Sequence, residues 1–549
     1  MRIMVFHYHL LPGGVTDVII HSVRAVIQHV PDVQEVRLVT GRPENTATVL
    51  ACIAGTAGPS EDHEAPPAAT LNDVPVAVDI FPELGYTDPR ESDSEAADRA
   101  RTLERGLLER YGSDEALWWV HNYHLGKNPS FTRALCAIAT LPGAPRMLLH
   151  VHDFPECARY ENLAYLNRVA GPSPYPAGPE VRYAVINERD RQALREAGIP
   201  DARVGLLLNP LPLEEALNSD APGVGGSLSD RERVVARLAD FAADQGYRFH
   251  PDGPLLLYPI RAIRRKNVLE IASIARLVPD ANLIVTLPGV SEPEQPYSQL
   301  VDYAYDDRRV HGVFGIGLRE DEYALSFEQI AAAADLVVSS SVQEGFGLLF
   351  VNALRWRRPL LARRLDVLAG IDSLFSGYPA HLYDAFSVPT RSPSVSSMQA
   401  YLRMRYQERL AELDRVLPAR AKVQLTQDVD GLLTGESIDL SFLPAQMQLT
   451  LLGDLRERGF GALVRALNAD TISAVERLQA AEAPDSTENL TRLLGYGSFA
   501  RSFTALVGEA GSAGAGQERY EGVQDALVER FARMEQLRLI LGPMDAAPH

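Results

Sequence analysis

Apolar and polar positions alternate along the first part of the chain in a regular way. Apolar runs of strand length are separated by stretches in which apolar residues recur at helical spacing. Strands separated by helices pair in parallel and form a layered α/β sheet, and ligands then gather beyond the carboxyl ends of the strands. The predicted strands are residues 2–6, 36–40, 117–120, 147–150, 183–186 and 205–208.

A second series with the same pattern follows the stretch 219–227, which is rich in small residues and suits an interdomain linker. Its predicted strands are residues 254–259, 282–286, 313–316, 335–339 and 359–362, and its helices include 267–277 and 327–334. The chain therefore reads as two Rossmann-like α/β domains. The predicted division is 1–218, 228–388, a mainly helical insertion at 389–484, and 485–549 as a crossover helix, tether and terminal helix.

Local signals support several of the predicted helices. Asn187 is a suitable N-cap for a helix closed by Gly198, and Asn128 before a proline opens another. The helical insertion is expected to include 397–416 and 472–481 and either to cover the cleft or to build a homo-oligomer. We expect a surface loop at 55–73, a flexible tether at 510–517 and one final helix at 520–541.

Composition narrows the class of protein. The 549 residues are too many for one ordinary core, and 46% hydrophobic with 23% charged residues is typical of a soluble globular protein. We expect a cytoplasmic protein, because no signal peptide or membrane-length apolar run is seen and the three cysteines form no close pair. A net charge of −19 makes nucleic acid and anionic membranes improbable partners.

A glycine pair follows the first strand and leads into an amphipathic helix. Gly13 and Gly14 allow backbone amides to approach a ligand, and the helix N-terminus favours an anion such as phosphate. A tight strand-to-helix turn is an equally good interpretation. The spacing G-x-G-x-x-G of dinucleotide-binding enzymes is absent, which disfavours a dehydrogenase.

His152 stands at the end of another predicted strand, in the run His150-Val-His152-Asp153. From that position it can project into a cleft, although a buried structural histidine is the alternative. No third ligand lies at suitable spacing, so we expect no metal site.

Basic side chains follow the first strand of the second series, from Arg261 to Lys266. Two cations aimed at one point suit a diphosphate, since arginine offers a planar fork and lysine a compact charge. Such a pair stabilises the charge that develops as a nucleoside diphosphate departs. The alternative is a solvated basic loop.

The most informative segment runs from Ser339 to Leu354. A strand ends in serines and a glycine-flanked turn leads into an apolar helix, which turns the amides of Gly345, Phe346 and Gly347 toward a ligand with Glu344 beside them. A glutamate there can accept hydrogen bonds from sugar hydroxyls. A glycine turn with a solvated glutamate is the alternative.

These motifs, taken in order, resemble the retaining GT-B glycosyltransferases that include sucrose, sucrose-phosphate and mannosyl transferases (glycosyltransferase family four). The resemblance spans residues 1–370 and the late helix 489–507, and it implies two domains that face a cleft. It implies that Gly13 and Gly14 meet the donor phosphate and that His152 lies near the donor sugar. It implies catalytic roles for His152, Arg261, Lys266 and Glu344, and donor contacts by Gly13, Gly14, Arg261, Lys266, Phe314, Ile316, Glu344, Gly345, Phe346, Gly347 and Asn352.

The same resemblance implies retention of anomeric configuration, no metal, and no cofactor besides the nucleotide-sugar co-substrate, with a UDP-sugar favoured over a GDP-sugar. The implied reaction moves a hexose, glucose or mannose, to a hydroxyl of a small soluble acceptor. One departure is Asn352, which stands where the family usually carries the second glutamate that binds ribose. An amide can still bind hydroxyls, but the departure leaves open a nucleotide-sugar-binding protein without activity.

Acceptors in this fold generally meet the first domain, so polar residues after its strand 117–120 form the candidate acceptor wall: His121, Lys127 and Asn128. Lys127 is suited to a carboxylate or phosphate, and a helix-capping loop is the alternative. An epimerase or a phosphorylase on the same fold remains a competing interpretation. A lipid-directed enzyme is disfavoured, because no basic amphipathic face is seen.

Overall fold

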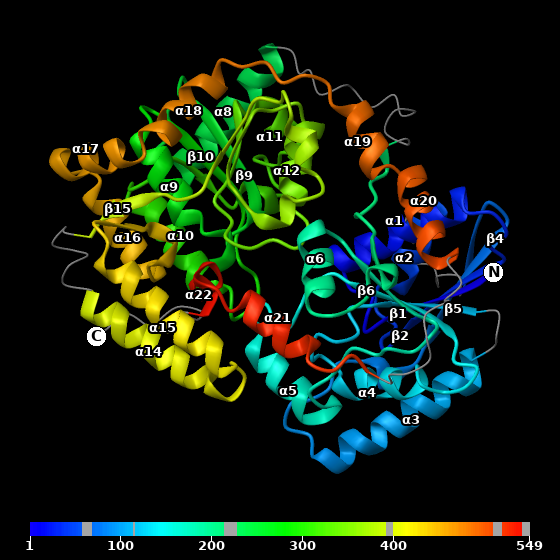
Figure 1. The fold of residues 1–549 in the computed structure, drawn as a ribbon. Helices are drawn as coiled ribbons and strands as arrows, with labels where there is room; N and C mark the ends of the chain where they lie inside the picture. The colour runs from blue at the N-terminus through cyan, green and yellow to red at the C-terminus, as the bar shows by residue number, and fades with distance from the viewer. Residues whose placement is uncertain (57–67, 113–115, 214–227, 391–398, 509–518, 541–549) are drawn as a thin grey trace. The chain divides into compact units, whose positions relative to one another are not determined.

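The computed structural model describes residues 1–56, 68–112, 116–213, 228–390, 399–508 and 519–540. They form two compact units, and the chain passes between them more than once. Unit 1 comprises 1–219, 415–418 and 488–532, and unit 2 comprises 220–414, 419–487 and 533–549. Figure 1 follows the chain by colour, and orange and red segments from late in the sequence rejoin the blue and cyan elements of unit 1.

Unit 1 is built on a sheet whose described strands follow the order β3-β4-β2-β1-β5-β6-β7-β8. All neighbours pair in parallel except the edge pair β3 and β4. The order reverses between β1 and β5, which is the position where doubly wound folds bind ligands. The strands are β1 (Arg2–His7), β2 (Glu35–Thr40), β3 (Ala68–Leu71), β4 (Val74–Ile80), β5 (Ala116–His121), β6 (Arg146–Val151), β7 (Val181–Val185) and β8 (Val204–Leu206).

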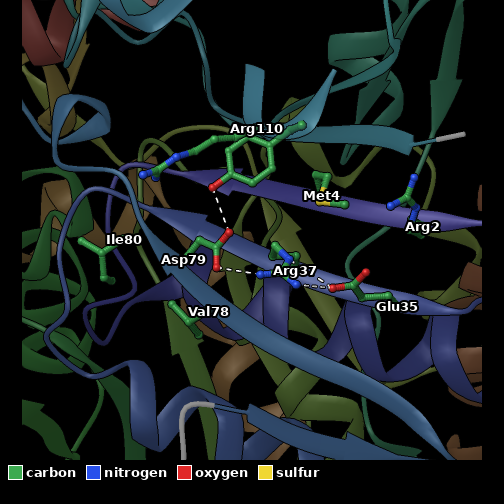
Figure 2. A pocket seen from close by; sticks show the side chains of 9 residues that line it. Arg2, Met4, Glu35, Arg37, Val78, Asp79, Ile80 and Arg110 are labelled. Atoms are coloured by element: carbon green, nitrogen blue, oxygen red, sulfur yellow. Dashed lines mark hydrogen bonds and ion pairs between the residues drawn. The ribbon is translucent and has the colours of Figure 1, made fainter. Parts of the chain in front are cut away.

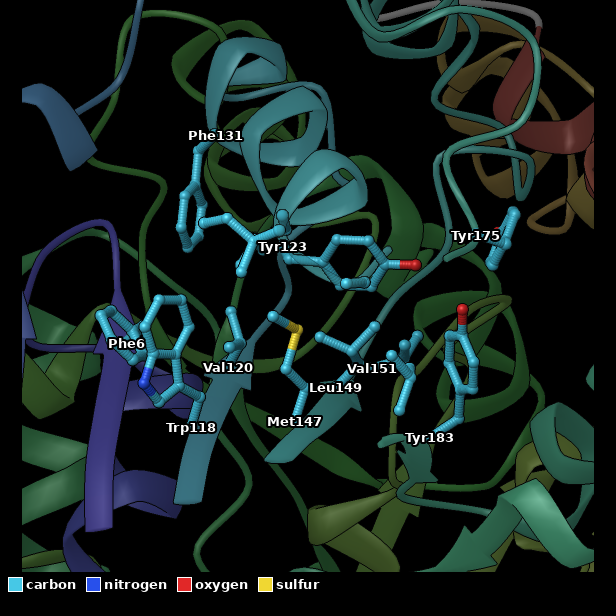
Figure 3. Packing of buried hydrophobic residues seen from close by; sticks show 14 of the residues in the cluster. Phe6, Trp118, Val120, Tyr123, Phe131, Met147, Leu149, Val151, Tyr175 and Tyr183 are labelled. Atoms are coloured by element: carbon cyan, nitrogen blue, oxygen red, sulfur yellow. The ribbon is translucent and has the colours of Figure 1, made fainter. Parts of the chain in front are cut away.

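Helices cover both faces of this sheet. Alternate strand residues enter two apolar layers, one against α1, α2 and α20 and the other against α3, α4, α6 and α21. Figure 3 shows the second layer, where Phe6, Trp118 and Phe131 pack together. The helices are α1 (Gly14–His29), α2 (Thr46–Ala54), α3 (Asp93–Tyr111), α4 (Pro129–Ile138), α5 (Tyr160–Ala170), α6 (Glu188–Glu196), α19 (Thr487–Leu494), α20 (Tyr496–Gly508) and α21 (Val523–Phe531), with turns η1 (Pro82–Leu84) and η2 (Asp201–Arg203).

Unit 2 contains a six-stranded sheet among its described residues, and all its strands are parallel. Its order β11-β10-β9-β12-β13-β14 is that of a Rossmann fold, with the reversal between β9 and β12. The strands are β9 (Leu255–Arg261), β10 (Asn282–Leu287), β11 (Gly312–Phe314), β12 (Leu336–Ser339), β13 (Leu360–Arg363) and β14 (Ala380–Tyr383), and β15 (Ser387–Pro389) pairs separately with β16 (Ser437–Asp439).

The helical segment after β15 belongs to unit 2, where α16 packs on α9 and α18 packs on β13 and β14. The helices of the unit are α8 (Leu228–Asp244), α9 (Val268–Leu277), α10 (Gln295–Asp306), α11 (Phe327–Ala333), α12 (Leu348–Arg355), α14 (Gln399–Glu412), α15 (Ala419–Thr434), α16 (Ala445–Asp454), α17 (Arg458–Leu467), α18 (Ala469–Gln479) and α22 (Met534–Ile540). Its short turns are η3 (Arg264–Lys266), η4 (Ile316–Leu318), η5 (Asp366–Leu368), η6 (Asp372–Phe375), η7 (Leu413–Arg415) and η8 (Leu440–Phe442).

A buried arginine ties this helical segment to the sheet. Arg363, at the end of β13, donates to both carboxylate oxygens of Glu270 on α9, at 3.1 and 2.6 Å. It also donates to both oxygens of Asp439 on β16, each at 2.8 Å. Because all three side chains are nearly inaccessible, removing one would leave buried charge without a partner.

The predicted α/β pattern is confirmed, with differences in detail. The helices capped by Asn128 and Asn187 begin where predicted, and each asparagine accepts a backbone N–H of its first turn. The surface loop predicted at 55–73 was wrong in part, since 68–71 forms edge strand β3. The single final helix was also wrong, because α21 and α22 are separate helices in different units. The predicted linker 219–227 and the predicted tether 510–517 lie outside the described residues.

Among the described residues, no helix combines the length and apolar character that spanning a membrane would require.

Candidate functional site

The loops after β9 and β12 meet at the point where the strand order of unit 2 reverses. They are joined by backbone and side-chain hydrogen bonds: Val342 N donates to Arg265 O at 2.9 Å, and Ser340 Oγ donates to Asn267 O at 2.9 Å. Tyr258 on β9 donates from its hydroxyl to Lys266 O at 2.7 Å. These bonds fix the basic turn beside the loop that carries Glu344.

The carboxylate of Glu344 is the centre of this arrangement. Its Oε1 accepts from Lys266 Nζ and, at 2.6 Å, from Ser341 Oγ, while Oε2 accepts from Arg265 at 3.2 Å. Burial opposes ionisation, but the charges of Lys266 and then Arg265 outweigh it and hold the pKa of Glu344 below its ordinary value. Burial lowers the pKa of Lys266, and the Glu344 charge offsets this only in part.

Arg261 does not join this group. Its guanidinium lies at 3.2 Å from Glu294 Oε1, whereas Lys266 and Arg265 converge on Glu344. Glu294 Oε2 also accepts the backbone N–H groups of Val290 and Ser291, which belong to the loop after β10. Arg261 and Lys266 therefore do not point at one place in this structure, and Arg265 supplies the second cation on Glu344.

Arg264 links the basic turn to the helical segment. It is partly buried, and it donates to Leu443 O at 3.1 Å and Ser441 O at 3.3 Å, both after β16. It also donates to Asn267 Oδ1 at 3.1 Å. The helical segment therefore supports the turn that presents Lys266.

The other predicted donor residues of unit 2 are differently placed. Gly347 has φ +84° at the start of α12, a backbone region that favours glycine, and the turn Gly345–Gly347 precedes that helix. Asn352 lies on α12, where its Oδ1 accepts from Arg355 at 3.2 Å. Phe314 is 7% exposed and Ile316 is fully buried, so these two side chains are part of the core. Contact of Phe314 and Ile316 with a nucleotide base stays a prediction.

In unit 1, Gly13 and Gly14 lie at the N-terminus of α1 as expected. Thr16 Oγ1 donates to Leu11 O at 2.7 Å and closes the loop, while Asn45 Nδ2 donates to Leu10 O at 2.6 Å. The amides of this turn are positioned at the β1 side of the reversal in strand order, where an anion is favoured.

His152 belongs to a buried group of histidines. His121 Nδ1 and His152 Nε2 are 2.9 Å apart, and ligand atoms of His121, His150 and His152 all lie within 4.8 Å of one another. The prediction that no third ligand is available was wrong. It rested on spacing within one strand, whereas His121 pairs opposite His150 in the neighbouring strand β5.

Burial keeps these imidazoles neutral. It is the largest cause that lowers the pKa of His121 and His152 well below the ordinary value, and the neighbouring histidines lower both further. The pKa of His150 is lowered to about 3 by the same burial. His152 is 5% exposed, and its backbone N–H donates to Asn122 Oδ1 at 2.8 Å.

Two of the three predicted acceptor residues are buried in unit 1. Asn128 is fully buried, and its amide is used in capping α4 and in donating to Glu83 O and Gly85 O at 2.7 and 2.8 Å. His121 is 1% exposed and faces His152. Of the three residues, only Lys127 keeps a partly exposed side chain, and acceptor contact by any of them stays a prediction.

A hollow of about 530 Å³ in unit 1 lies away from these residues. It opens near the first residues of β1 and β2, and Figure 2 shows Arg37 between Glu35 and Asp79. The hydroxyl of Tyr111 donates to Asp79 Oδ2 at 3.0 Å. Because Arg37 already pairs with two carboxylates and the expected ligand edge is at the opposite strand ends, we assign the hollow no role.

Sequence reasoning missed Arg265 and Ser341 as partners of Glu344. Both lie within segments that it had selected, so the signal was present, but the choice among adjacent residues depends on the exact turn. Arg264, Arg265 and Lys266 occupy one short turn, which sends neighbouring side chains in different directions.

Comparison with known proteins gives a relative over nearly the whole chain. The chain is 30% identical over 496 residues to mannosylglucosyl-3-phosphoglycerate synthase of Petrotoga mobilis, covering 89% of this chain and 88% of that protein. No family model matches.

Solved structures were compared as well. Anabaena HepE in complex with UDP covers 92% of this chain and 100% of its own, at 14% identity and TM-score 0.46. Sucrose-phosphate synthase from Thermosynechococcus elongatus covers 84% and 99%, at 14% identity and TM-score 0.43. Given the extent and identity of the match to the Petrotoga synthase, the chain belongs to the GT-B glycosyltransferases and is an enzyme of that family.

Proposed function

We propose that this glycosyltransferase moves a hexosyl group, glucose or mannose, from a nucleoside diphosphate sugar to a hydroxyl of a small acceptor, with retention of configuration. The observation that carries the proposal is the Glu344 group of unit 2, where Lys266 and Arg265 hold a buried carboxylate at the switch point of a Rossmann sheet. The name of the Petrotoga relative, a synthase of mannosylglucosyl-3-phosphoglycerate, supports a phosphoglycerate glycoside as acceptor.

Lys266 has the role of stabilising the leaving group. A mostly buried ammonium in the turn after β9 stabilises negative charge more strongly than one in water, because the surroundings screen it less. When a diphosphate binds there, Lys266 Nζ exchanges part of its interaction with Glu344 for a phosphate oxygen. Arg261, which is half exposed and paired with Glu294, turns to the same phosphates.

Glu344 has the role of binding the sugar. Released in part from Lys266, its carboxylate accepts hydrogen bonds from hydroxyls of the transferred hexose, while Ser341 keeps it oriented. His152, neutral at physiological pH, offers a hydrogen bond to the same sugar. We propose that Gly13 and Gly14 contribute backbone amides to the donor phosphate and that Asn352 replaces a glutamate in holding the ribose.

We further propose that transfer needs no metal and no bound cofactor, with a UDP-sugar preferred over a GDP-sugar. Lys266, Arg261 and the backbone amides supply the positive charge that a divalent ion supplies in other transferases. The three histidines at the end of β5 and β6 make this proposal testable, because neutral imidazoles are good zinc ligands. Metal analysis of the purified chain, together with turnover after chelation, decides it.

The experiment that tests the proposal is a panel of UDP- and GDP-sugars offered with small acceptors, among them glucosyl-3-phosphoglycerate and its unphosphorylated analogue, with products identified by mass spectrometry and anomeric configuration by NMR. We expect one hexosyl addition to the acceptor and release of a nucleoside diphosphate. Binding without product would instead indicate a nucleotide-sugar-binding protein, and a changed sugar without acceptor would indicate an epimerase.

A further inference from the structure

Five loops at the carboxyl edge of the unit 1 sheet are locked together by close backbone contacts. Gly41, after β2, approaches Gly85, after β4, so closely that an added Cβ would lie 2.2 Å from Gly85 N. Gly41 N also donates to Tyr8 O after β1, at 3.1 Å. Any side chain at Gly41 would force these loops apart.

The loops after β5 and β6 join the same edge. Thr87 N donates to Lys127 O at 2.9 Å, which ties the loop after β4 to the loop after β5. Gly126, with φ +67°, packs against Asn162 of α5, where an added Cβ would lie 2.3 Å from Asn162 O. The side chains on these loops are therefore presented by a rigid base rather than by independent segments.

Tyr86 stands at the centre of the side chains on this base. Its hydroxyl lies 3.0 Å from His9 Nε2, and Lys127 Nζ lies over its ring, 5.4 Å from the centroid. The ring is 46% exposed, so the group faces solvent. Tyrosine and histidine here offer hydrogen-bonding atoms next to a cation.

Two arginines lie near this group. Burial raises the pKa of Tyr86, and the charges of Arg159 and Arg42 draw it down, which places both guanidinium groups close to the phenol. Burial lowers the pKa of Lys127, and the charge of Arg159 lowers it further. Three cations from the loops after β2, β5 and β6 therefore lie near one exposed ring, and Lys127 lies over its face.

Two of these three cations have no ion-pair partner among the described residues. Within the described part of the chain, no carboxylate forms an ion pair with Lys127 or Arg42, and only Arg159 has one, with Asp153 at 2.8 Å. Holding three like charges together with only one carboxylate, Asp153, costs free energy unless a ligand supplies more negative charge. A rigid, half-buried group of this kind is suited to an anion.

We propose that Arg42, Lys127 and Arg159, arranged around Tyr86 and His9, bind the anionic end of the acceptor, a phosphate or carboxylate on a small molecule. Arg42 and Arg159 offer planar forks to the oxygens, Lys127 adds a compact charge, and the Tyr86 hydroxyl adds a hydrogen bond. The inference rests on the proposed function, since it assigns the group to the acceptor rather than to the donor. It makes acceptor charge a determinant of specificity.

The experiment measures equilibrium binding to the full chain without any sugar donor, by isothermal titration with 3-phosphoglycerate, glycerate and glycerol, and separately with UDP and GDP. Wild-type protein is expected to bind 3-phosphoglycerate, with affinity that falls as salt rises, and to bind glycerol at least tenfold more weakly. Arg42→Ala and Lys127→Gln are each expected to weaken 3-phosphoglycerate binding about tenfold, a loss of the size expected for one charged hydrogen bond.

Arg105→Ala, an exposed change on α3, is the matched control and should bind as wild type. Unchanged 3-phosphoglycerate affinity in both variants would overturn the inference. So would a loss confined to UDP or GDP, because that outcome would assign the cations to the donor. If Lys127→Gln fails to fold, Arg42→Ala still decides, since Arg42 is exposed. If no nucleotide sugar in the donor panel gives product, the result for 3-phosphoglycerate binding still stands. The failure of the proposed function can therefore be distinguished from the failure of this inference.

Discussion

Lys266 and Glu344 in unit 2 meet as buried ions, whereas His121 and His152 in unit 1 meet as buried neutral rings. Both pairs lie at the carboxyl edge of a parallel sheet beside the reversal in strand order. Unit 2 keeps its ions by surrounding a carboxylate with two cations and a hydroxyl, and unit 1 avoids charge by lowering the pKa values of its imidazoles. The same sheet topology therefore accommodates buried polar groups in two ways, as paired ions in unit 2 and as neutral rings in unit 1.

The test with the largest expected effect removes Lys266, one of the two cations that contact Glu344 in unit 2. Lys266→Ala is expected to lower kcat/KM about 100- to 1000-fold, because a buried charge near the leaving group is lost and Arg265 alone remains on Glu344. Steady-state kinetics with the donor and acceptor found in the panel measures the effect. Lys422→Ala removes the partly exposed partner of Asp414 and should change kcat/KM little.

Activity of the Lys266 variant within threefold of wild type, with an unchanged circular dichroism spectrum, would remove the leaving-group role. The ion pairs around Glu344 would then have a structural role only, and the difference between the two units would concern stability alone.

The second test lowers the pH. The pKa values of His7 and His150 are lowered to about 3 by burial, so between pH 6.5 and 3 the unfolded chain binds protons that the folded chain does not. Unit 1 is expected to lose stability as pH falls from 7 to 5, by about 2 kcal/mol for each such histidine. The lowered pKa of Glu344 keeps the contribution of this carboxylate to unit 2 until more acidic solution.

Hydrogen–deuterium exchange measures this difference, as protection factors for peptides of β5 and β6 against those of β9 and β12 at pH 7 and pH 5. Protection should fall in β5 and β6 first. Equal losses in both sheets would contradict the neutral state of the unit 1 histidines.

The smallest test uses an exception within unit 1. Burial raises the pKa of Glu156 to about 7, while Tyr175 donates to its Oε1 at 3.0 Å. Its contribution is fully present below the unfolded pKa near 4.5 and is lost as pH rises toward 7. Glu156→Gln removes that loss and should stabilise unit 1 by up to about 3 kcal/mol at pH 8, and by much less at pH 5.

Thermal unfolding at both pH values measures the effect of Glu156→Gln, with Glu109→Gln, an exposed change on α3, as the control. A variant that is equally stable relative to wild type at pH 5 and pH 8 would show that Glu156 is ionised in the folded chain throughout this range.

Much of the α/β framework can be predicted from the local sequence pattern, because buried parallel strands are continuous apolar runs and many helices begin at a recognisable capping residue. Asn128 and Asn187 show this, since each caps the helix predicted from its position. Edge strands were harder. Ala68–Leu71 is a short run of small residues with exposed positions, and its only strand partner among the described residues is β4.

The candidate site was predictable by segment and not by contact. Glu344 and Lys266 were both selected, but their meeting depends on hydrogen bonds between two loops distant in sequence. His121 and His150 lie opposite each other only through strand register, which no spacing within one strand reveals. The partner of Arg261, Glu294, sits in the loop after a third strand.

Helix α20 has a consequence for how the protein is made. Its Phe499 stacks on Trp119, and its Phe503 packs against the same ring at a tilt. Both complete the apolar layer over β1 and β5, yet they lie late in the sequence. A ribosome therefore releases the first sheet of this enzyme long before it synthesises the helix that covers it. The apolar surface stays uncovered while the ribosome translates the part of unit 2 that precedes α19. We therefore expect the nascent chain to bind chaperones that shield hydrophobic surface.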